Sequence, residues 1–331
     1  MSRVTVYHIA KEAEVSVSSV SRVLNGSRLI GGASSRRVLE IAERLGYTKR
    51  NIRKQGSRAI LNIKLVLPLY QQRGRHLFYD FAELVGGIKS GCAPARVHLV
   101  TEIGSAEIFE HKKGGDIDGV IFAFNRPPLS VYRQLLESGV PHLTLNRVLK
   151  DHDYICCDNA GGVETLLRVI SERMSKPRPC YLGLTSIADI NRRRQQGFKK
   201  GIDALRLSGD SEIILALGSS DDLNRDFVVH LMGMNCNAVL CFNDIVALKL
   251  IAVAQDARLP LLEKMSVTGF DNSPVRDLLA PRLDTISMPV ADIGRNTGAW
   301  IQQRIIGRSA EPFRLNLEGV YVAGNTIKEL P

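Results

Sequence analysis

The residues best suited to contact DNA lie close together near the amino terminus. Within the segment VTVYHIAKEAEVSVSSVSRVLNG, from Val4 to Gly26, a second short helix is expected to present Val17, Ser18, Ser21 and Arg22 on its outer face, near its amino end. Their methyl, hydroxyl and guanidinium groups can reach into a DNA groove. The pattern therefore indicates a protein that reads DNA.

Two helices and a tight turn would position these side chains. Thr5 and Ser16 can each accept a hydrogen bond from the first turn of the helix that follows, so both are expected to act as amino-terminal caps. Apolar residues recur every three to four positions and should face a shared core, namely Val6, Ile9, Ala10 and Ala13 in the first helix and Val20, Val23 and Leu24 in the second. The expected turn comprises Ala13, Glu14 and Val15.

Positive charge is concentrated in the same region. Residues 1–64 contain 13 Lys and Arg against 4 Glu, which accounts for nearly all of the chain's net charge of +10. A basic segment attracts phosphates by releasing counterions, and this adds affinity that does not depend on base sequence. A merely solvated charged face is the alternative, but here the charge coincides with the helix pair.

The sequence argues against an enzyme, a membrane protein and an exported protein. It contains no GxSxG, GxxxxGK or HExxH motif, and its seven His are scattered. Its six Cys lack CxxC spacing and neighbouring His, which predicts buried thiols in a reducing compartment. No stretch reaches the roughly 20 apolar residues of a membrane span, and no signal sequence is recognisable. We therefore expect a cytoplasmic, nucleoid-associated protein without cofactor or metal.

From Ile60 onward, apolar runs alternate with helical patterns. The runs ILNIKLVLP, VHLVT, IDGVIFAF, PHLTL, YICC, CYLGL, EIILAL, NAVLCF and MSVTGF each predict a buried strand. This alternation predicts an α/β body of doubly wound parallel sheets with helices on both faces. The units exceed one sheet of five or six strands, so we expect two lobes, with ligands at the carboxyl ends of strands.

Taken together, these segments resemble the lactose-repressor (LacI/GalR) family of bacterial transcription regulators over nearly the whole chain. The front carries the pattern VTxxxxAKxAxVSxxxVSRVLNG and then RVLEIAERLGY, and the body carries LVLP, IDGVIF, GVPHLTLNR, DNAGG, CFND, VTGFDN and PRLDTISMPVADIG in the family's order. The resemblance implies an α-helical helix-turn-helix headpiece on residues 1–60, with a hinge at about 48–60, and a body like the periplasmic sugar-binding proteins on residues 61–331. The first lobe would comprise about 61–158 and 289–319, and the second about 159–288 and 320–331.

The resemblance assigns the outer face of the second helix to the major groove. Val17 and Ser18 are then the specificity pair, and Arg22 is expected to contact a guanine, with a phosphate contact as the alternative. The short polar side chains of Thr5, Ser16, Ser21 and Asn25 are expected to contact phosphate oxygens.

Two positions depart from the family pattern. Glu14 stands where a Gly normally closes the turn, and a positive φ there would cost on the order of 1 kcal/mol. In the hinge, which includes Asn51, Ile52, Arg53 and Lys54, Gly56 and Ser57 occupy the place of a Leu that wedges into the minor groove. The sequence therefore predicts a hinge that binds mainly phosphates and kinks its operator less than usual.

The resemblance also implies an effector site between the lobes. Arg194, Asn243 and Asp271 match positions that contact the effector, with solvent exposure as the alternative for Arg194. An Arg, an Asn and an Asp in one cleft suit a hydroxyl-rich or amide-bearing small molecule. Asp158 is a further candidate, with helix capping as the alternative.

Aromatic residues are less clearly assigned to this site. Phe78, Tyr79 and Phe81 are candidates for the pocket lining or for the core. The single Trp, Trp300, lies on an apolar helical stripe with Ile293, Ile301 and Ile305, which favours packing over ligand binding.

The expected protein is a homodimeric repressor that binds a pseudo-palindromic double-stranded DNA operator. Its operator affinity would be controlled allosterically by a sugar or related hydroxylated metabolite, with a coupling of roughly 1–3 kcal/mol. The alternative is a LacI-like regulator that responds to a protein partner or to no small effector. The sequence favours both kinds of regulator over an enzyme.

Overall fold

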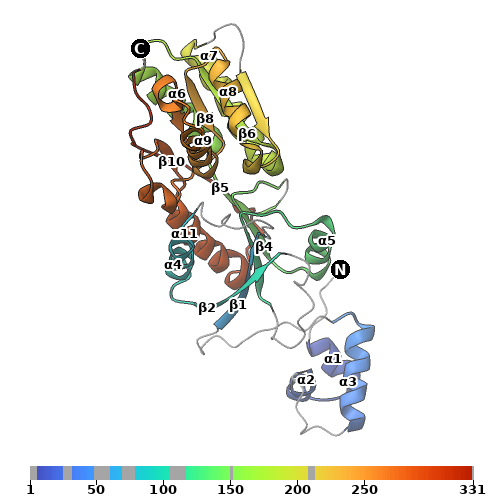
Figure 1. The fold of residues 1–331 in the computed structure, drawn as a ribbon. Helices are drawn as coiled ribbons and strands as arrows, with labels where there is room; N and C mark the ends of the chain where they lie inside the picture. The colour runs from blue at the N-terminus through green and yellow to red at the C-terminus, as the bar shows by residue number, and fades with distance from the viewer. Residues whose placement is uncertain are drawn as a thin grey trace. The chain divides into compact units, whose positions relative to one another are not determined.

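The computed structural model describes residues 6–24, 32–47, 60–68, 79–104, 117–149, 152–207 and 213–329. The chain divides into two compact units, Met1–Ser57 and Arg58–Pro331, which are described separately (Figure 1). In the described part of the chain no helix combines the length and the apolar character needed to cross a membrane.

The first unit contains three helices, α1 (Val6–Ala13), α2 (Val17–Leu24) and α3 (Gly32–Arg44). Their small core is formed by Ile9, Ala10, Ala13, Val20, Val23, Val38, Ile41 and Ala42. Lys11 and Glu12 are exposed. The predicted helix pair and its inward stripes are therefore confirmed where side chains are described.

The turn between α1 and α2 depends on Glu14, which adopts a left-handed backbone with φ of 55°. This is the strain expected where a non-Gly residue closes the turn, and it costs on the order of 1 kcal/mol. The exposed Glu14 carboxylate forms an ion pair with Arg37 of α3 at 3.3 Å, which contributes little because both groups face water.

The second unit contains a six-stranded parallel sheet in the order β11-β5-β4-β3-β1-β2. Its strands are β1 (Ile60–Leu67), β2 (Arg96–Ile103), β3 (Gly119–Ala123), β4 (His142–Leu145), β5 (Tyr154–Cys157) and β11 (Arg314–Leu317). Ile63 and Leu65 of β1 pack toward α4 (Phe81–Gly91) and α11 (Val290–Trp300), whereas Val66 belongs to a separate core with α5 (Leu129–Ser138). Because strand side chains alternate, helices cover both faces of this sheet.

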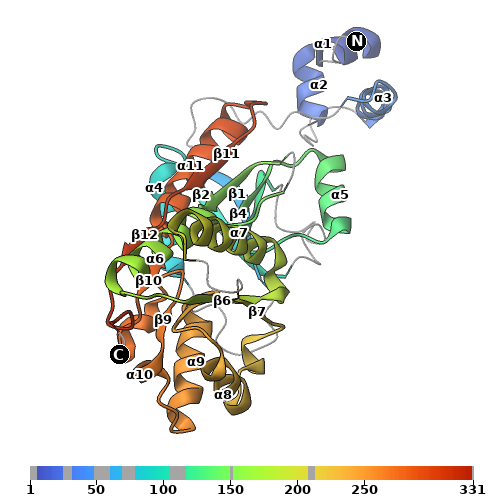
Figure 2. The same cartoon turned by 90° about the horizontal axis from the view of Figure 1, so that it is seen from above.

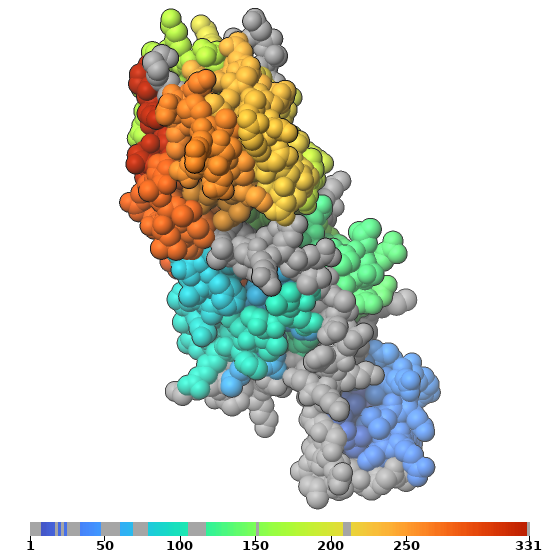
Figure 3. Space-filling model, viewed as in Figure 1, coloured from blue at the N-terminus to red at the C-terminus, as the bar shows by residue number. Residues whose placement is uncertain are grey.

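A four-stranded parallel sheet, in the order β7-β6-β8-β9, follows the same plan. Its strands are β6 (Pro179–Leu184), β7 (Ile213–Leu217), β8 (Ala238–Cys241) and β9 (Ser266–Thr268). Tyr181 shares a core with α6 (Asn159–Arg173) and α7 (Ala188–Leu205), and Leu182 shares one with α8 (Arg225–Gly233), α9 (Asp244–Asp256) and α10 (Leu261–Lys264). Helices α8 and α9 contribute to the yellow and orange surface seen in Figure 3.

Three segments of chain connect the two sheets: β5 to α6, β10 (Thr285–Ser287) to α11, and β11 to β12 (Val320–Val322). Strands β10 and β12 pair as an antiparallel ribbon. A Cβ at Gly319 would lie 2.5 Å from Ile286 and 3.5 Å from the Cys157 sulfur, so the three segments pass side by side. Only a residue without a side chain fits between them.

Helices α4 and α11 lie side by side (Figures 1 and 2), and glycines allow their backbones to approach closely. A Cβ at Gly91 would lie 2.1 Å from the Arg295 carbonyl oxygen, and one at Gly298 would lie 2.3 Å from Gly91. The helix α11 continues into a π-helical segment, Ile301–Ile306. Trp300 is fully buried and donates its Nε1–H to Asp153 at 2.7 Å, which confirms that its stripe is packing.

All nine predicted strands are present, but the prediction of burial is wrong for β2, which has no buried residue, and for β7, which has one, because both are edge strands. All six Cys are buried free thiols. The sequence reading missed β10, β11 and β12. These strands have three or four residues, and β11 and β12 are only partly buried, so neither length nor apolar character marks them.

Candidate functional site

In the first unit, the candidate DNA-contacting residues Val17, Ser18, Ser21 and Arg22 all lie on α2, although their side chains are not described. Ser16 precedes α2, and its hydroxyl accepts a hydrogen bond from the Ser19 N–H at 3.1 Å, as expected of a cap. The candidates Thr5 and Asn25 and the hinge residues Asn51, Ile52, Arg53 and Lys54 lie outside the described residues.

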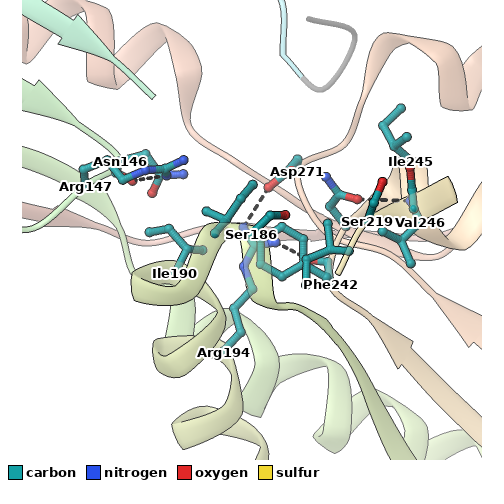
Figure 4. A pocket seen from close by; sticks show the side chains of 14 residues that line it. Asn146, Arg147, Ser186, Ile190, Arg194, Ser219, Phe242, Ile245, Val246 and Asp271 are labelled. Carbon is teal, nitrogen blue, oxygen red and sulfur yellow. Dashed lines mark hydrogen bonds and ion pairs between the residues drawn. The ribbon is translucent and has the colours of Figure 1, made fainter. Parts of the chain in front are cut away.

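In the second unit, a cavity of about 270 Å³ opens at the carboxyl ends of the parallel strands. This is where ligands bind in sheets of this kind. Residues after β4 form one side and residues after β6, β7, β8 and β9 form the other (Figure 4). The described lining comprises Asn146, Arg147, Leu184, Ser186, Ile187, Ile190, Arg194, Ser219, Ser220, Phe242, Asn243, Ile245, Val246 and Asp271.

Arg194 of α7 points into the centre of this site (Figure 4). Its side chain is only 2% exposed, and its guanidinium donates to Asn159 Oδ1 at 2.9 Å, to Asp271 Oδ1 at 2.8 Å and to the Phe242 carbonyl. The guanidinium carbon also lies 3.7 Å from the Phe270 ring centroid and 4.7 Å from that of Phe242. The solvent-exposed alternative for Arg194 is therefore wrong.

Asp271 follows β9 and holds a positive φ of 99°, and its neighbour Asn272 has a φ of 53°. Asn146, after β4, has a φ of 49°. Non-Gly residues in this region of the Ramachandran plot are rare and concentrate at functional sites, where surrounding structure holds them. Burial raises the pKa of the Asp271 carboxyl, and the adjacent Arg194 guanidinium opposes this shift.

Asn243 precedes α9 and accepts a hydrogen bond from the Val246 N–H at 3.0 Å, so it caps the helix and also lines the cavity. The next residue, Asp244, is fully buried and accepts from the Thr285 hydroxyl at 2.5 Å and the Ser273 N–H at 2.6 Å. Burial raises the pKa of Asp244 to about 7, despite the hydrogen bond from Thr285. A second titratable carboxyl thus lies directly behind the site.

The structure brings Arg194, Asn243 and Asp271 together but separates the other three candidates from the cavity lining. Tyr79 is buried against Phe124, with ring centroids 4.2 Å apart. Phe81 begins α4 and is 39% exposed. Asp158 caps α6 by accepting from the Gly161 N–H at 3.0 Å, which was the alternative for this residue. The remaining aromatic candidate, Phe78, lies outside the described residues.

Sequence reasoning missed Asn146 and Arg147, although both follow the predicted strand PHLTL. Asn146 accepts hydrogen bonds from Asn159 Nδ2 at 3.2 Å and Cys157 N at 3.4 Å, which ties this side of the cavity to the Arg194 network. A polar pair directly after a buried strand was the available signal, because the carboxyl ends of parallel strands meet at one edge.

Two family models match this chain. Residues 5–50 match the model of bacterial regulatory proteins, lacI family, and residues 178–326 match the model of the periplasmic binding protein-like domain. The chain thus carries a lacI-family helix-turn-helix domain and a periplasmic binding protein-like domain, and its relatives are LacI/GalR-type transcriptional regulators. It is a DNA-binding transcriptional regulator with an effector-binding domain, not an enzyme.

Regulators of this kind align with nearly the whole chain. The transcriptional repressor PurR of Vibrio atlanticus (strain LGP32) is 23% identical, with 98% of this chain and 99% of the relative covered. Among solved structures, the CelR–cellobiose complex has a TM-score of 0.65 and 23% identity and covers 98% of this chain and 100% of that one. The lac repressor dimer bound to operator and the anti-inducer ONPF has a TM-score of 0.64 and 18% identity, and covers 99% and 100%.

Proposed function

We propose that this lacI-family regulator is a homodimeric repressor whose affinity for a pseudo-palindromic operator is set by a small molecule in the cavity. The carrying observation is the buried Arg194–Asp271 pair inside a cavity at the strand ends. A buried ion pair is weak evidence for stability alone, whereas directed charges beside a cavity are typical of ligand sites. The relative crystallised with cellobiose supports a sugar or a related hydroxylated metabolite.

The headpiece, residues 1–60, would read the operator through α2 in the major groove. Val17 and Ser18 would select bases, Arg22 would contact a guanine, and Thr5, Ser16, Ser21 and Asn25 would contact phosphates. The hinge at about 48–60 would join it to lobes formed by about 61–158 with 289–319 and about 159–288 with 320–331. The protein would act on the nucleoid in the cytoplasm.

The effector would engage Arg194, Asn243 and Asp271, to which the cavity adds Asn146 and Arg147. A ligand that binds one lobe arrangement more tightly shifts the population toward it and changes operator affinity by the same free energy, roughly 1–3 kcal/mol. The sign of that coupling decides between inducer and corepressor.

Selection of binding sites from random duplexes, with and without candidate effectors, tests this proposal. We expect two inverted half-sites at a fixed spacing and a change in affinity on effector addition. A protein that selects a half-site but responds to no small molecule would favour the alternative, a regulator controlled by a protein partner or by no effector. Absence of any selected sequence would refute the assignment of α2.

A further inference from the structure

Hydrogen bonds among five residues close a ring at the cavity, and one member of this ring joins the two cavity walls. We propose, building on the proposed function, that Asn159 is a positioning residue for effector response. It would hold Asn146 of one wall and Arg194 of the other at a fixed separation. Asn159 is not among the described lining residues, so it would act through these two neighbours.

The Asn159 side chain uses both its donor and its acceptor groups. Asn159 is 1% exposed, and its Nδ2 donates to Asn146 Oδ1 at 3.2 Å and to the Cys157 carbonyl at 2.9 Å. Its Oδ1 accepts from Arg194 Nε at 2.9 Å. An amide carries two N–H donors and one carbonyl acceptor on a single planar group. Asn159 can therefore donate toward one wall and accept from the other at the same time.

The two residues that Asn159 joins belong to different lobes. Asn146 follows β4 of the six-stranded sheet, whereas Arg194 lies on α7, which packs against the four-stranded sheet. Both side chains line the cavity (Figure 4). Asn159 is the first residue of α6, directly after the connection from β5. A change in the separation of the walls must therefore lengthen or break a hydrogen bond to Asn159.

The ring closes through a second connection between the lobes, the one from β10 to α11. Asn146 Nδ2 donates to the Met288 sulfur at 3.4 Å, and the Met288 N–H donates to the Asp271 carbonyl at 3.3 Å. Asp271 Oδ1 accepts from Arg194 at 2.8 Å, and Arg194 leads back to Asn159. The ring thus includes both cavity walls and touches two of the chain connections between the sheets.

Two ring members hold backbone conformations that depend on their surroundings. Asn146 has a φ of 49° and Asp271 a φ of 99°. Non-Gly residues keep such conformations only where neighbouring structure restrains them. The side-chain bonds of the ring supply part of that restraint, so loss of the Asn159 amide would loosen the wall that carries Asn146.

An effector that bonds Arg194 or Asp271 would meet this ring directly. Ligand groups there would compete with links of the ring, and bonds in a buried network depend on one another. A change at the cavity would then reach the connections between the sheets. Such a route counts as allosteric only if its members are energetically coupled, which can be measured without knowing the effector.

Double-mutant cycles in urea unfolding of the full-length protein test the link between the walls. Asn146→Ala, Arg194→Lys and the double variant are compared in the parent chain and again in the presence of Asn159→Ala. We expect a coupling of at least about fivefold in the unfolding equilibrium constant in the parent chain, and less than about twofold without the Asn159 amide. Equal coupling in both backgrounds, or none in the parent chain, would overturn the proposal.

Asn191 provides a matched control. It is also a buried amide, 6% exposed, and it accepts from the Tyr181 hydroxyl at 3.0 Å. Asn191→Ala should lower stability but leave the coupling between Asn146 and Arg194 unchanged. If Asn159→Ala does not fold, Asn159→Ser replaces it with the same expectation, because its shorter hydroxyl cannot bridge both walls.

Operator binding separates a positioning role from a merely structural one. On the selected operator at fixed salt, we expect Asn159→Ala to change the affinity by at least about threefold and Asn191→Ala by less than about twofold. An unchanged affinity of folded Asn159→Ala would overturn the proposal and leave the proposed function standing. If the protein selects no operator, the proposed function fails, whereas the unfolding cycles still decide whether Asn159 links the walls.

Discussion

The contacts of Arg194 make its removal costly. Arg194→Ala would leave the buried Asp271 carboxylate without its cation, and breaking a buried pair in this way costs about 3–5 kcal/mol. The exposed neighbour Arg192 is the matched control, and Arg192→Ala should change stability by less than about 0.5 kcal/mol. Urea unfolding of both variants measures the difference. Equal stabilities would show that the pair is solvated.

Asp244 makes stability depend on pH. Its pKa is about 7 in the folded protein against a usual 3.8, so between these values the folded state holds a proton that the unfolded state has released. The contribution of this group to stability therefore falls as pH rises from about 4 to 7. We expect Asp244→Asn to flatten this part of the unfolding free energy profile. A profile with the same slope as that of the parent protein would contradict the assignment.

On α2, Arg22 and Ser21 are expected to play different parts in binding DNA. Arg22→Ala should remove about 1–3 kcal/mol of discrimination at one base pair, whereas Ser21→Ala should weaken all sites similarly. Binding to cognate and scrambled duplexes at fixed salt measures both. Equal losses on the two duplexes for Arg22→Ala would reassign that residue to a phosphate.

Motifs shared with the family, rather than residue types alone, pointed to Arg194, Asn243 and Asp271, and the structure places all three in the lining of one cavity. They did not show that Arg194 would bond three acceptors from separate segments, since such contacts depend on packing. Tyr79 and Asp158 show the opposite difficulty. An aromatic ring and a capping carboxylate serve the core and a helix end as readily as a ligand.

At the scale of elements, the contact between α4 and α11 is the most demanding. Gly91→Ala would place a methyl group 2.1 Å from the Arg295 carbonyl, so the helices must separate, at a cost of about 1–3 kcal/mol or more. Gly86 lies on the same helix with nothing within 4 Å of an added Cβ. Gly86→Ala should be neutral or stabilising by up to about 1 kcal/mol. Thermal unfolding of the pair checks this, and an equal effect of both would contradict the close approach.

The strands illustrate what a pattern in sequence can and cannot reveal. Seven of the nine predicted strands have apolar runs because half or more of their residues are buried in a parallel sheet, whereas the edge strands β2 and β7 are mostly exposed or partly buried. Strand β11 alternates exposed and partly buried residues at the sheet edge, and its pairing with β5 joins residues 314 and 154. Nothing local in the sequence specifies so distant a partner.

At the scale of the whole molecule, the hinge sequence bears on how the operator is shaped. Gly56 and Ser57 supply no apolar wedge, so we expect a smaller central kink than a Leu at this place would produce. Permuting the operator within a fragment measures the bend angle by gel mobility. Gly56→Leu should increase the angle. A strong kink with the natural sequence would instead implicate Ile52 or Ile60.

The two sheets of the body also share one apolar core, since Leu84 and Trp300 belong to the same cluster as Leu166 and Phe198. Behind the cavity, apolar side chains from the helices of both sheets pack against one another. The two lobes are thus held together by apolar packing as well as by chain connectivity.

The three chain connections that pass side by side at Gly319 bear on how the two lobes move relative to each other. Because the three connections pack against one another at one crossing, we expect the angle between the two sheets to change mainly about this crossing. An effector in the cavity would then influence the rest of the molecule through this one angle. Gly319→Ala would place a methyl group 2.5 Å from Ile286, so we expect it to restrict movement at the crossing. The cavity lining would be unchanged, but an effector would alter operator affinity less.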